Sequence, residues 1–120
     1  MIRLDQDLII FNADGEKIPV YIEGDAPPME TLPREYFTVS EDATTNAVTA
    51  DNKARAYLFE FTLKYYTNDP NTLYTRLIEA IELLKSKGYD VEGIGYRNGT
   101  YNNTWHSRAV DLEKIENLEE

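Results

Sequence analysis

The sequence predicts an α+β domain in which one main helix, residues 69–87, packs on one face of a mostly antiparallel sheet of about four to five strands. Three patterns support this fold class. Residues 55–66 alternate with a period of two, which is typical of a half-buried strand. Residues 73–84 repeat apolar side chains at spacings of three and four, as in an amphipathic helix. Residues 97–103 connect the last two strands and are few enough to favour antiparallel pairing.

The length and composition indicate one domain. The chain has 120 residues, of which 42% are hydrophobic and 28% charged, so it can bury one core but not two ordinary ones. We therefore expect a single domain over residues 1–120. No apolar run approaches the roughly 18 residues that a membrane span needs, so no membrane partner is expected. The absence of cysteine excludes disulfides, thiolate metal sites and cysteine nucleophiles.

The beginning of the chain is ambiguous. Residues 4–12 fit either a short helix or a strand, and the pattern slightly favours the helix. Asp14-Gly15 between apolar runs is a hairpin signal, which keeps the strand open as an alternative. Residues 18–22 alternate as a strand does. Pro19 cannot donate a hydrogen bond to a neighbouring strand, so we expect this strand to lie at an edge of the sheet or only to begin there.

Turn-rich segments surround the next short strand, residues 36–39. Residues 24–33 contain one glycine and three prolines and are predicted to be a loop. Residues 40–54 are small and polar apart from Val48, and we expect a flexible loop there. Loops longer than about 12 residues in a compact domain are usually functional or disordered.

The central strand and the main helix have the strongest patterns. One face of the strand is expected to carry Tyr57, Phe59, Phe61, Leu63 and Tyr65. Asp69 can cap the start of the helix, and Pro70 suits the first helical position because its missing N–H is harmless there. Gly88 is a natural left-handed stop.

The last part of the chain is predicted to form a hairpin. Residues 89–96 and 105–112 are expected as strands, with Asn98-Gly99 at the tip of the turn between them. Gly93 and Gly95 resemble a glycine-rich loop only superficially, since they do not stand between a strand and a helix, and they indicate a bent or bulged strand. Residues 113–120 are expected to be a frayed or extended acidic arm.

The formal net charge of −10 is distributed unevenly. Residues 1–52 hold eleven acids and three bases, and residues 111–120 hold five acids and one base. Residues 53–110 are nearly balanced, with six acids and eight bases. Nucleic-acid binding needs clustered Lys and Arg, so no specific nucleic-acid binding is expected.

The sequence contains no recognisable catalytic set. The single histidine, His106, stands beside Trp105 with no evident Ser or fixed carboxylate partner. Glu60 is the one acid inside a strongly apolar strand, and a cross-face ion pair with Lys64 would explain it. No metal-ligand spacing is present. We therefore assign no catalytic, cofactor-binding or metal-binding residues and do not expect an enzyme.

Several short segments occur in an order that resembles a known protein family. They are Ile18-Pro19-Val20-Tyr21, Leu32-Pro33-Arg34-Glu35-Tyr36-Phe37-Thr38-Val39, Phe59-Glu60-Phe61-Thr62-Leu63-Lys64-Tyr65-Tyr66, the Asp-Pro helix start, Leu84-Lys85-Ser86-Lys87-Gly88-Tyr89 and Trp105-His106-Ser107-Arg108-Ala109-Val110. Over roughly residues 18–112 this series resembles the tail-completion proteins of long-tailed bacteriophages and prophages, the tail-terminator and head–tail connector group.

The resemblance implies an α+β subunit that assembles into a ring, commonly of six copies. Such a ring caps the tail tube and offers a surface to the head connector, so the tube protein and the connector protein would be its partners. The subunit would occupy the cytoplasm of the bacterial host during assembly and then the virion tail. The family has no catalytic residues to carry over.

Two other functions stay open at this point. A small acidic binding or inhibitor protein, of the immunity type, would form a one-to-one complex with a basic partner through salt-sensitive association. A small α+β enzyme would need a cleft that joins His106 to Glu60 or to another buried acid.

Overall fold

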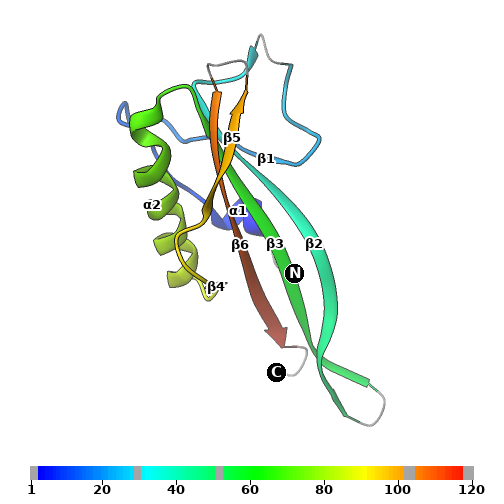
Figure 1. Ribbon diagram of the computed structural model, residues 1–120. Coiled ribbons are helices and arrows are strands. Elements are labelled where there is room, and N and C mark those ends of the chain that lie inside the picture. Colours follow the sequence, from blue (N-terminus) through cyan, green and yellow to red (C-terminus); the bar gives the residue numbers. More distant parts are fainter. Residues whose placement is uncertain (1–2, 29–30, 51–52, 102–104, 118–120) are drawn as a thin grey trace.

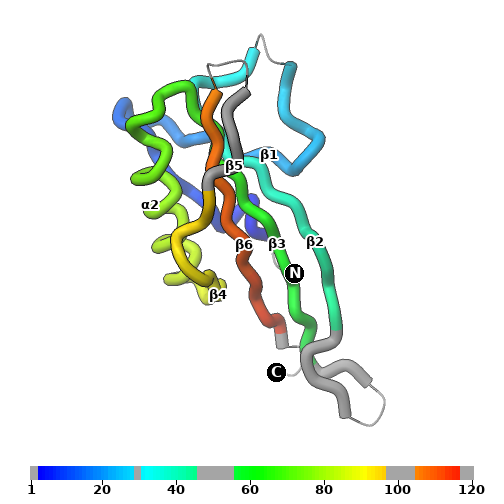
Figure 2. Tube along the Cα trace, in the orientation of Figure 1, coloured from blue at the N-terminus to red at the C-terminus, as the bar shows by residue number. Residues whose placement is uncertain are grey.

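The computed structural model describes residues 3–28, 31–50, 53–101 and 105–117 (Figures 1 and 2). The described residues fold into one mixed sheet with two α-helices, which confirms the α+β fold class. The elements are α1 (Leu4–Asp7), β1 (Val20–Ile22), β2 (Glu35–Ala50), β3 (Lys53–Thr67), a 3-10 turn (Pro70–Thr72), α2 (Leu73–Ser86), β4 (Asp90–Val91), β5 (Tyr96–Tyr101) and β6 (Trp105–Asn117).

The strands follow the order β1-β2-β3-β6-β4, and β5 pairs with β6 as well. Among the described strands, only β1 and β2 run parallel, and the other pairs are antiparallel. β1 pairs with just three residues of β2 and lies at the edge, as Pro19 in front of it predicts. The molecule is elongated, with extents of 54 × 25 × 23 Å, because β2 and β3 extend well past the helices (Figure 1).

The core lies between the sheet and the helices. The predicted inner face of β3 is confirmed, since Phe59, Phe61, Leu63 and Tyr65 are buried against α2 and Tyr57 packs at the margin. The side chains that α2 contributes to the core are Leu73, Leu77, Ala80, Ile81 and Leu84. Leu4 of α1 joins the same cluster, so both helices lie on one face of the sheet.

The ends of the main helix follow the predicted signals. The Asp69 side chain accepts a hydrogen bond from the Asn71 backbone N–H at 3.0 Å. The first turn, which includes Pro70, is 3-10 rather than α, and α2 proper begins at Leu73. Gly88 follows the last turn with a φ of 94°, the left-handed conformation that favours glycine.

The helix and the strand that the sequence allows for residues 4–12 are each confirmed in part. The helix exists but is only four residues long, at Leu4–Asp7. After it, Phe11 and Lys17 form an isolated antiparallel bridge around Gly15, whose φ is 80°. The Asp-Gly signal therefore marks a real turn that carries only one bridge.

The prediction of a loop at residues 40–54 is wrong. Residues 40–50 belong to β2, and β3 begins at Lys53, so this segment forms a long hairpin. The register between β2 and β3 shifts at Glu41/Ala43, Asn46/Val48 and Val48/Thr49. The first two shifts each add one residue to β2, which moves the following side chains to the other face and removes the period-two pattern that identifies a strand in sequence.

Two expectations near the end of the chain are also wrong. The strand expected at residues 89–96 is limited to Asp90–Val91, and the predicted turn tip, Asn98-Gly99, lies within β5 at a register shift. The segment expected as an arm, residues 113–120, continues β6 as far as Asn117, because β3 is long enough to pair with it there. Residues 118–120 of that arm lie outside the described residues.

Candidate functional site

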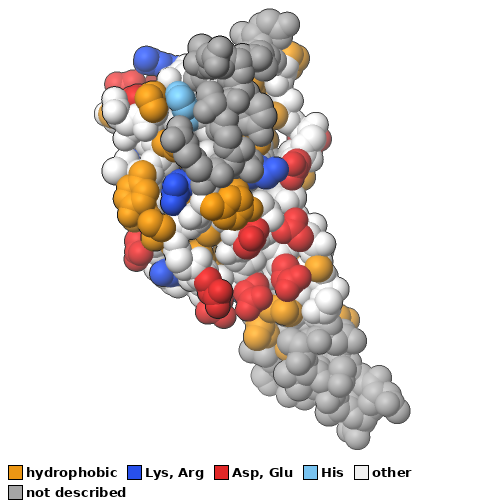
Figure 3. All heavy atoms as spheres, viewed as in Figure 1, with side chains coloured by type: hydrophobic (Ala, Val, Ile, Leu, Met, Phe, Trp, Pro, Cys, Tyr) orange, Lys and Arg blue, Asp and Glu red, His pale blue; other side chains and the backbone are white. Residues whose placement is uncertain are grey.

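Among the described elements, no helix covers the face of the sheet opposite α1 and α2 (Figure 1). One end of this face carries a cluster of aromatic side chains around Tyr36. The centroid of the Tyr36 ring lies 5.8, 4.9 and 5.6 Å from those of Tyr21, Tyr66 and Trp105. Farther along β6, β3 and β2, acidic side chains gather instead (Figure 3). No helix of the described part of the chain covers this acidic half.

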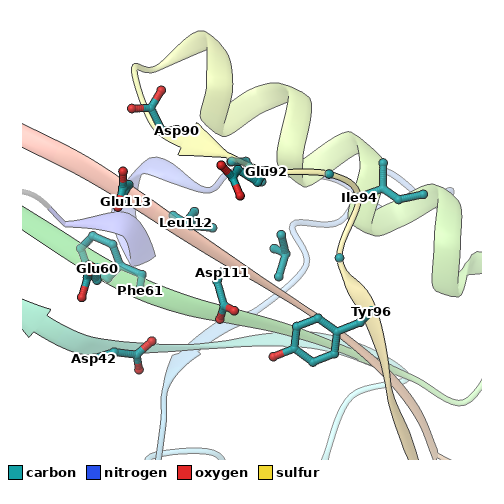
Figure 4. Close-up of a pocket in the computed structure, with 14 residues that line it drawn as sticks. Asp42, Glu60, Phe61, Asp90, Glu92, Ile94, Tyr96, Asp111, Leu112 and Glu113 are labelled. Carbon is teal, nitrogen blue, oxygen red and sulfur yellow. The ribbon is translucent and has the colours of Figure 1, made fainter.

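An open hollow of about 900 Å³ lies across the acidic half. Six carboxylates line it: Asp42, Glu60, Asp90, Glu92, Asp111 and Glu113 (Figure 4). They come from four strands and from the segment that follows β4. None of the described residues lining the hollow is Lys, Arg or His. The hollow is therefore a region of concentrated negative charge, and its described lining includes no basic side chain.

An interruption in the sheet edge shapes the hollow. Val91 stands opposite Leu112 and Tyr96 opposite Ala109, so four residues, 92–95, span the place of two residues of β6. Gly95 crosses β6 so closely that an added Cβ would lie 2.4 Å from the Ala109 carbonyl oxygen. This confirms that Gly93 and Gly95 mark a bulged segment, and both have positive φ.

Arg108 fixes the bulged segment in place. Its Nε donates to the carbonyl oxygen of Ile94 at 3.2 Å, and its Nη2 donates to that of Gly95 at 3.0 Å. The guanidinium also lies 5.5 Å from the centre of the Tyr74 ring on α2. One side chain thus joins β6, the bulge and the helix, so the wall of the hollow is held by contacts within the chain.

Like charges stand directly opposite one another on this face. Glu113 of β6 is flanked by Glu60 on β3 and by Asp90 on β4 in the strand register. One row along, the Thr62 hydroxyl contacts a carboxylate oxygen of Asp42 and lies 3.0 Å from Oδ1 of Asp111. Directly opposed like charges destabilise a sheet, so this arrangement works against the fold.

Exposed apolar side chains border the acids. Ile94, Tyr96 and Ile115 are 43%, 49% and 51% exposed. Tyr96 and Ile115 lie on the same face as the acids, and Ile94 belongs to the bulge at the edge of the hollow. The site therefore combines an acidic floor with a partly apolar border, which is a composition suited to protein contact.

The two acid–base candidates from the sequence are far apart. His106 stands opposite Thr67 and Glu60 opposite Glu113, an odd number of residues apart along β3, so their side chains lie on opposite faces of the sheet. Nδ1 of His106 is buried without a hydrogen-bond partner. Lys64, the expected partner of Glu60, forms an ion pair with Glu23 at 3.3 Å. The structure thus does not bring His106 and Glu60 together.

A second polar cluster lies on the helix side and joins α2 to the sheet. The Tyr65 hydroxyl donates to Oε1 of Glu35 at 2.8 Å and lies 3.0 Å from the Thr72 hydroxyl. Arg76 donates to the same Glu35 oxygen at 3.1 Å. Burial, together with the Glu35 carboxylate, raises the pKa of Tyr65 to about 12. Because these groups bind one another, the cluster is best explained as a structural one.

Neither a metal-binding cluster nor a membrane-spanning helix is present among the described residues. Within residues 3–28, 31–50, 53–101 and 105–117, no three His, Asp or Glu side chains are arranged to hold a metal ion. In the same ranges, no helix has the length and apolar character needed to cross a membrane. No protein-family model and no curated protein sequence matches the chain.

Proposed function

We propose that this protein is a structural subunit of a phage or prophage tail. In this proposal it is a tail-terminator or tail-completion protein that forms a ring, of six copies, at the head-proximal end of the tail. The ring binds the tail-tube protein on one side and the head-connector protein on the other. It assembles in the cytoplasm of the bacterial host, ends in the virion tail and has no catalytic activity.

The observation that carries the proposal is the length of sheet that the chain leaves uncovered. β3 has 15 residues and spans about 50 Å at roughly 3.3 Å per residue, whereas the 14 residues of α2 span about 21 Å. α2 is therefore less than half as long as β3, and among the described elements no helix covers the face of the sheet opposite α2. Long strands without a covering layer are a liability in a free monomer, and contact with other subunits removes it.

The two edges of the sheet also suit a ring. β1 covers only residues 37–39 of β2, so among the described strands none pairs with that edge from Ser40 onward. The other edge is formed by β4, β5 and the end of β6. Because the two edges differ, contact between them is heterologous, and heterologous contacts close into rings when the rotation between copies permits it.

The chain's charge is compatible with a channel through which DNA passes. With a net charge of −10 and no clustered bases, the ring would repel DNA rather than retain it. This supports a passive structural role and does not identify the partner.

Light scattering and negative-stain electron microscopy of the purified protein, alone and with tail tubes from the virion encoded by the same genome, test the proposal. We expect rings in solution or bound at one end of the tubes. Ile22→Lys, on the edge strand, should prevent assembly, whereas Ile9→Lys should not; the two side chains are 48% and 45% exposed. A protein that stays monomeric at high concentration and binds no tail tube would contradict the proposal. A genome that encodes no tail-tube protein would contradict it too.

The acidic hollow favours one second candidate, a small acidic inhibitor that binds a basic protein. Its complex would contain one copy of each chain, whereas a tail-end subunit binds as a ring. Light scattering of the complex distinguishes the two by mass.

A further inference from the structure

The acidic half of the sheet has a property that the proposed tail-end function does not require. A structural ring needs no particular charge on this face, and the solubility of an acidic protein does not require its charges to be adjacent. Yet Glu113 lies between Glu60 and Asp90 on neighbouring strands, and Asp42 and Asp111 approach the same Thr62 hydroxyl. Thr62 has one hydroxyl proton and can donate to only one of these carboxylates at a time.

The complementary charge is not available from the chain's own described bases. Most of these bases are engaged internally: Arg3 with Asp5, Lys64 with Glu23, Arg76 with Glu35 and Glu79, and Lys87, Arg108 and Lys114 with backbone carbonyl oxygens. Lys17, Arg34 and Lys85 are exposed but belong to three separate segments. A second copy of the chain therefore offers no described basic patch that matches six carboxylates.

The face also offers apolar contacts beside the charges. Tyr96 and Ile115 project from the same side of the sheet as the acids, and both are about half exposed. Aromatic and aliphatic anchors next to complementary charge are typical of protein–protein interfaces. A small cation would use the carboxylates alone and would leave these side chains in water.

We propose that the acidic half of the uncovered sheet face, from the Glu60–Glu113–Asp90 row to Tyr96, is a docking surface for a Lys- and Arg-bearing segment of a different protein. The basic side chains of that segment lie against the opposed carboxylates, and its apolar side chains contact Tyr96 and Ile115. Binding relieves the repulsion between the opposed acids. This inference goes beyond the proposed tail-end function, and for the second candidate it names the surface that would bind the basic partner.

The first test uses a defined probe, a seven-residue peptide that alternates Lys with Val, and a second peptide with Gln in place of Lys. Binding is followed by amide chemical shifts of the ¹⁵N-labelled protein at low and high salt. We expect the Lys peptide to shift amides of β6, β4 and the bulge, and its affinity to fall as salt is added. The Gln peptide should bind much more weakly.

A matched pair of triple variants assigns the effect to this face. Glu60→Gln/Asp111→Asn/Glu113→Gln should weaken Lys-peptide binding by about tenfold to a hundredfold, since three exposed ion pairs each contribute a factor of roughly two to five. Asp14→Asn/Glu16→Gln/Glu82→Gln removes the same charge elsewhere and should change affinity less than twofold. The first variant should also have a higher urea midpoint than the wild type at low salt, because it removes the opposed charges.

Several results would overturn the inference. Equal loss of affinity in both triple variants would mean that only net charge matters. Shifts confined to other surfaces, or equal binding of the Gln peptide, would exclude this docking surface. Self-association that disappears in the first variant would make a second copy the occupant. Tube binding that persists while the Lys peptide fails to bind would refute this inference and leave the proposed function standing.

Discussion

The Tyr65 hydroxyl is expected to stabilise the fold through its contact with Glu35. The Tyr65 side chain is fully buried, and its hydroxyl bridges Glu35 of β2 and Thr72 at the start of the helix. Tyr65→Phe keeps the ring in the core and removes only the oxygen. The Glu35 carboxylate then retains Arg76 as a donor but loses one hydrogen bond in a part-buried site.

The expected cost follows from the kind of bond that is lost. A hydrogen bond to a charged group contributes about 1.5–3 kcal/mol, and Arg76 keeps part of the carboxylate satisfied. We therefore expect Tyr65→Phe to lower the free energy of unfolding by about 2 kcal/mol at pH 7. For an all-or-none transition this is a large fraction of the stability of a small domain.

Burial of the Tyr65 hydroxyl should make the loss of stability in Tyr65→Phe depend on pH. The pKa of Tyr65 is about 12 in the folded state, above the ordinary value of 10, because burial disfavours the phenolate. A raised folded pKa gives stability that is complete below pH 10 and is lost as pH rises toward 12. Two pKa units correspond to about 3 kcal/mol, so the difference between wild type and Tyr65→Phe should shrink over this interval.

Urea unfolding followed by the fluorescence of Trp105, at pH 7, 10 and 11, measures both effects. Tyr74→Phe is the matched control, because Tyr74 is 51% exposed and its ring can stay against Arg108 after the change. It should cost less than about 0.5 kcal/mol. Burial and Asp7 raise the pKa of Tyr89 too, but Tyr89 is present in every variant and cancels in the comparison. A cost below about 0.5 kcal/mol for Tyr65→Phe, or one that does not change with pH, would refute the reasoning.

Three further substitutions test the bulge, the core and the helix cap by urea unfolding. Gly95→Ala should lower the free energy of unfolding by at least about 2 kcal/mol more than Gly93→Ala, since both glycines have positive φ but only a Cβ at Gly95 would meet the Ala109 carbonyl. Equal losses in the two variants would mean that backbone strain from the positive φ alone matters. Leu77→Ala, at a fully buried position of α2, should cost about 2–5 kcal/mol, and a cost near zero would show that the core there is loose. Asp69→Ala should cost about 1 kcal/mol while Asp69→Asn is nearly neutral, and an equal loss in both would exclude capping as the reason.

Features that depend on local periodicity could be predicted from the sequence. The inner face of β3 follows from alternation between Tyr57 and Tyr65, and the limits of α2 follow from Asp69 before it and Gly88 after it. These patterns are local because the side chains that a strand or helix buries recur at a fixed spacing within that element. The fold class follows from them, since one helix and several strands have few ways to share a core.

Features that depend on strand pairing could not be predicted in the same way. The hairpin at residues 40–54 has small polar side chains and three register shifts, so the strand has no constant face to reveal it. The bulge after β4 is different, because Gly93 and Gly95 do indicate it. Its depth depends on the contact between Gly95 and Ala109, which only the pairing of β5 with β6 creates.

The acidic surface could not be predicted because its charges converge only through register. Asp111 and Glu113 alternate with buried Val110 and Leu112, which by itself indicates an ordinary strand with one wet face. Pairing then brings Glu60 to one side of Glu113 and Asp90 to the other. Carboxylates that are distant in sequence thus become neighbours at a cost to stability. A chain that needed only solubility could place the same charges on the exposed side of α2 without that cost, and this is why the arrangement favours a basic partner over a simply solvated face.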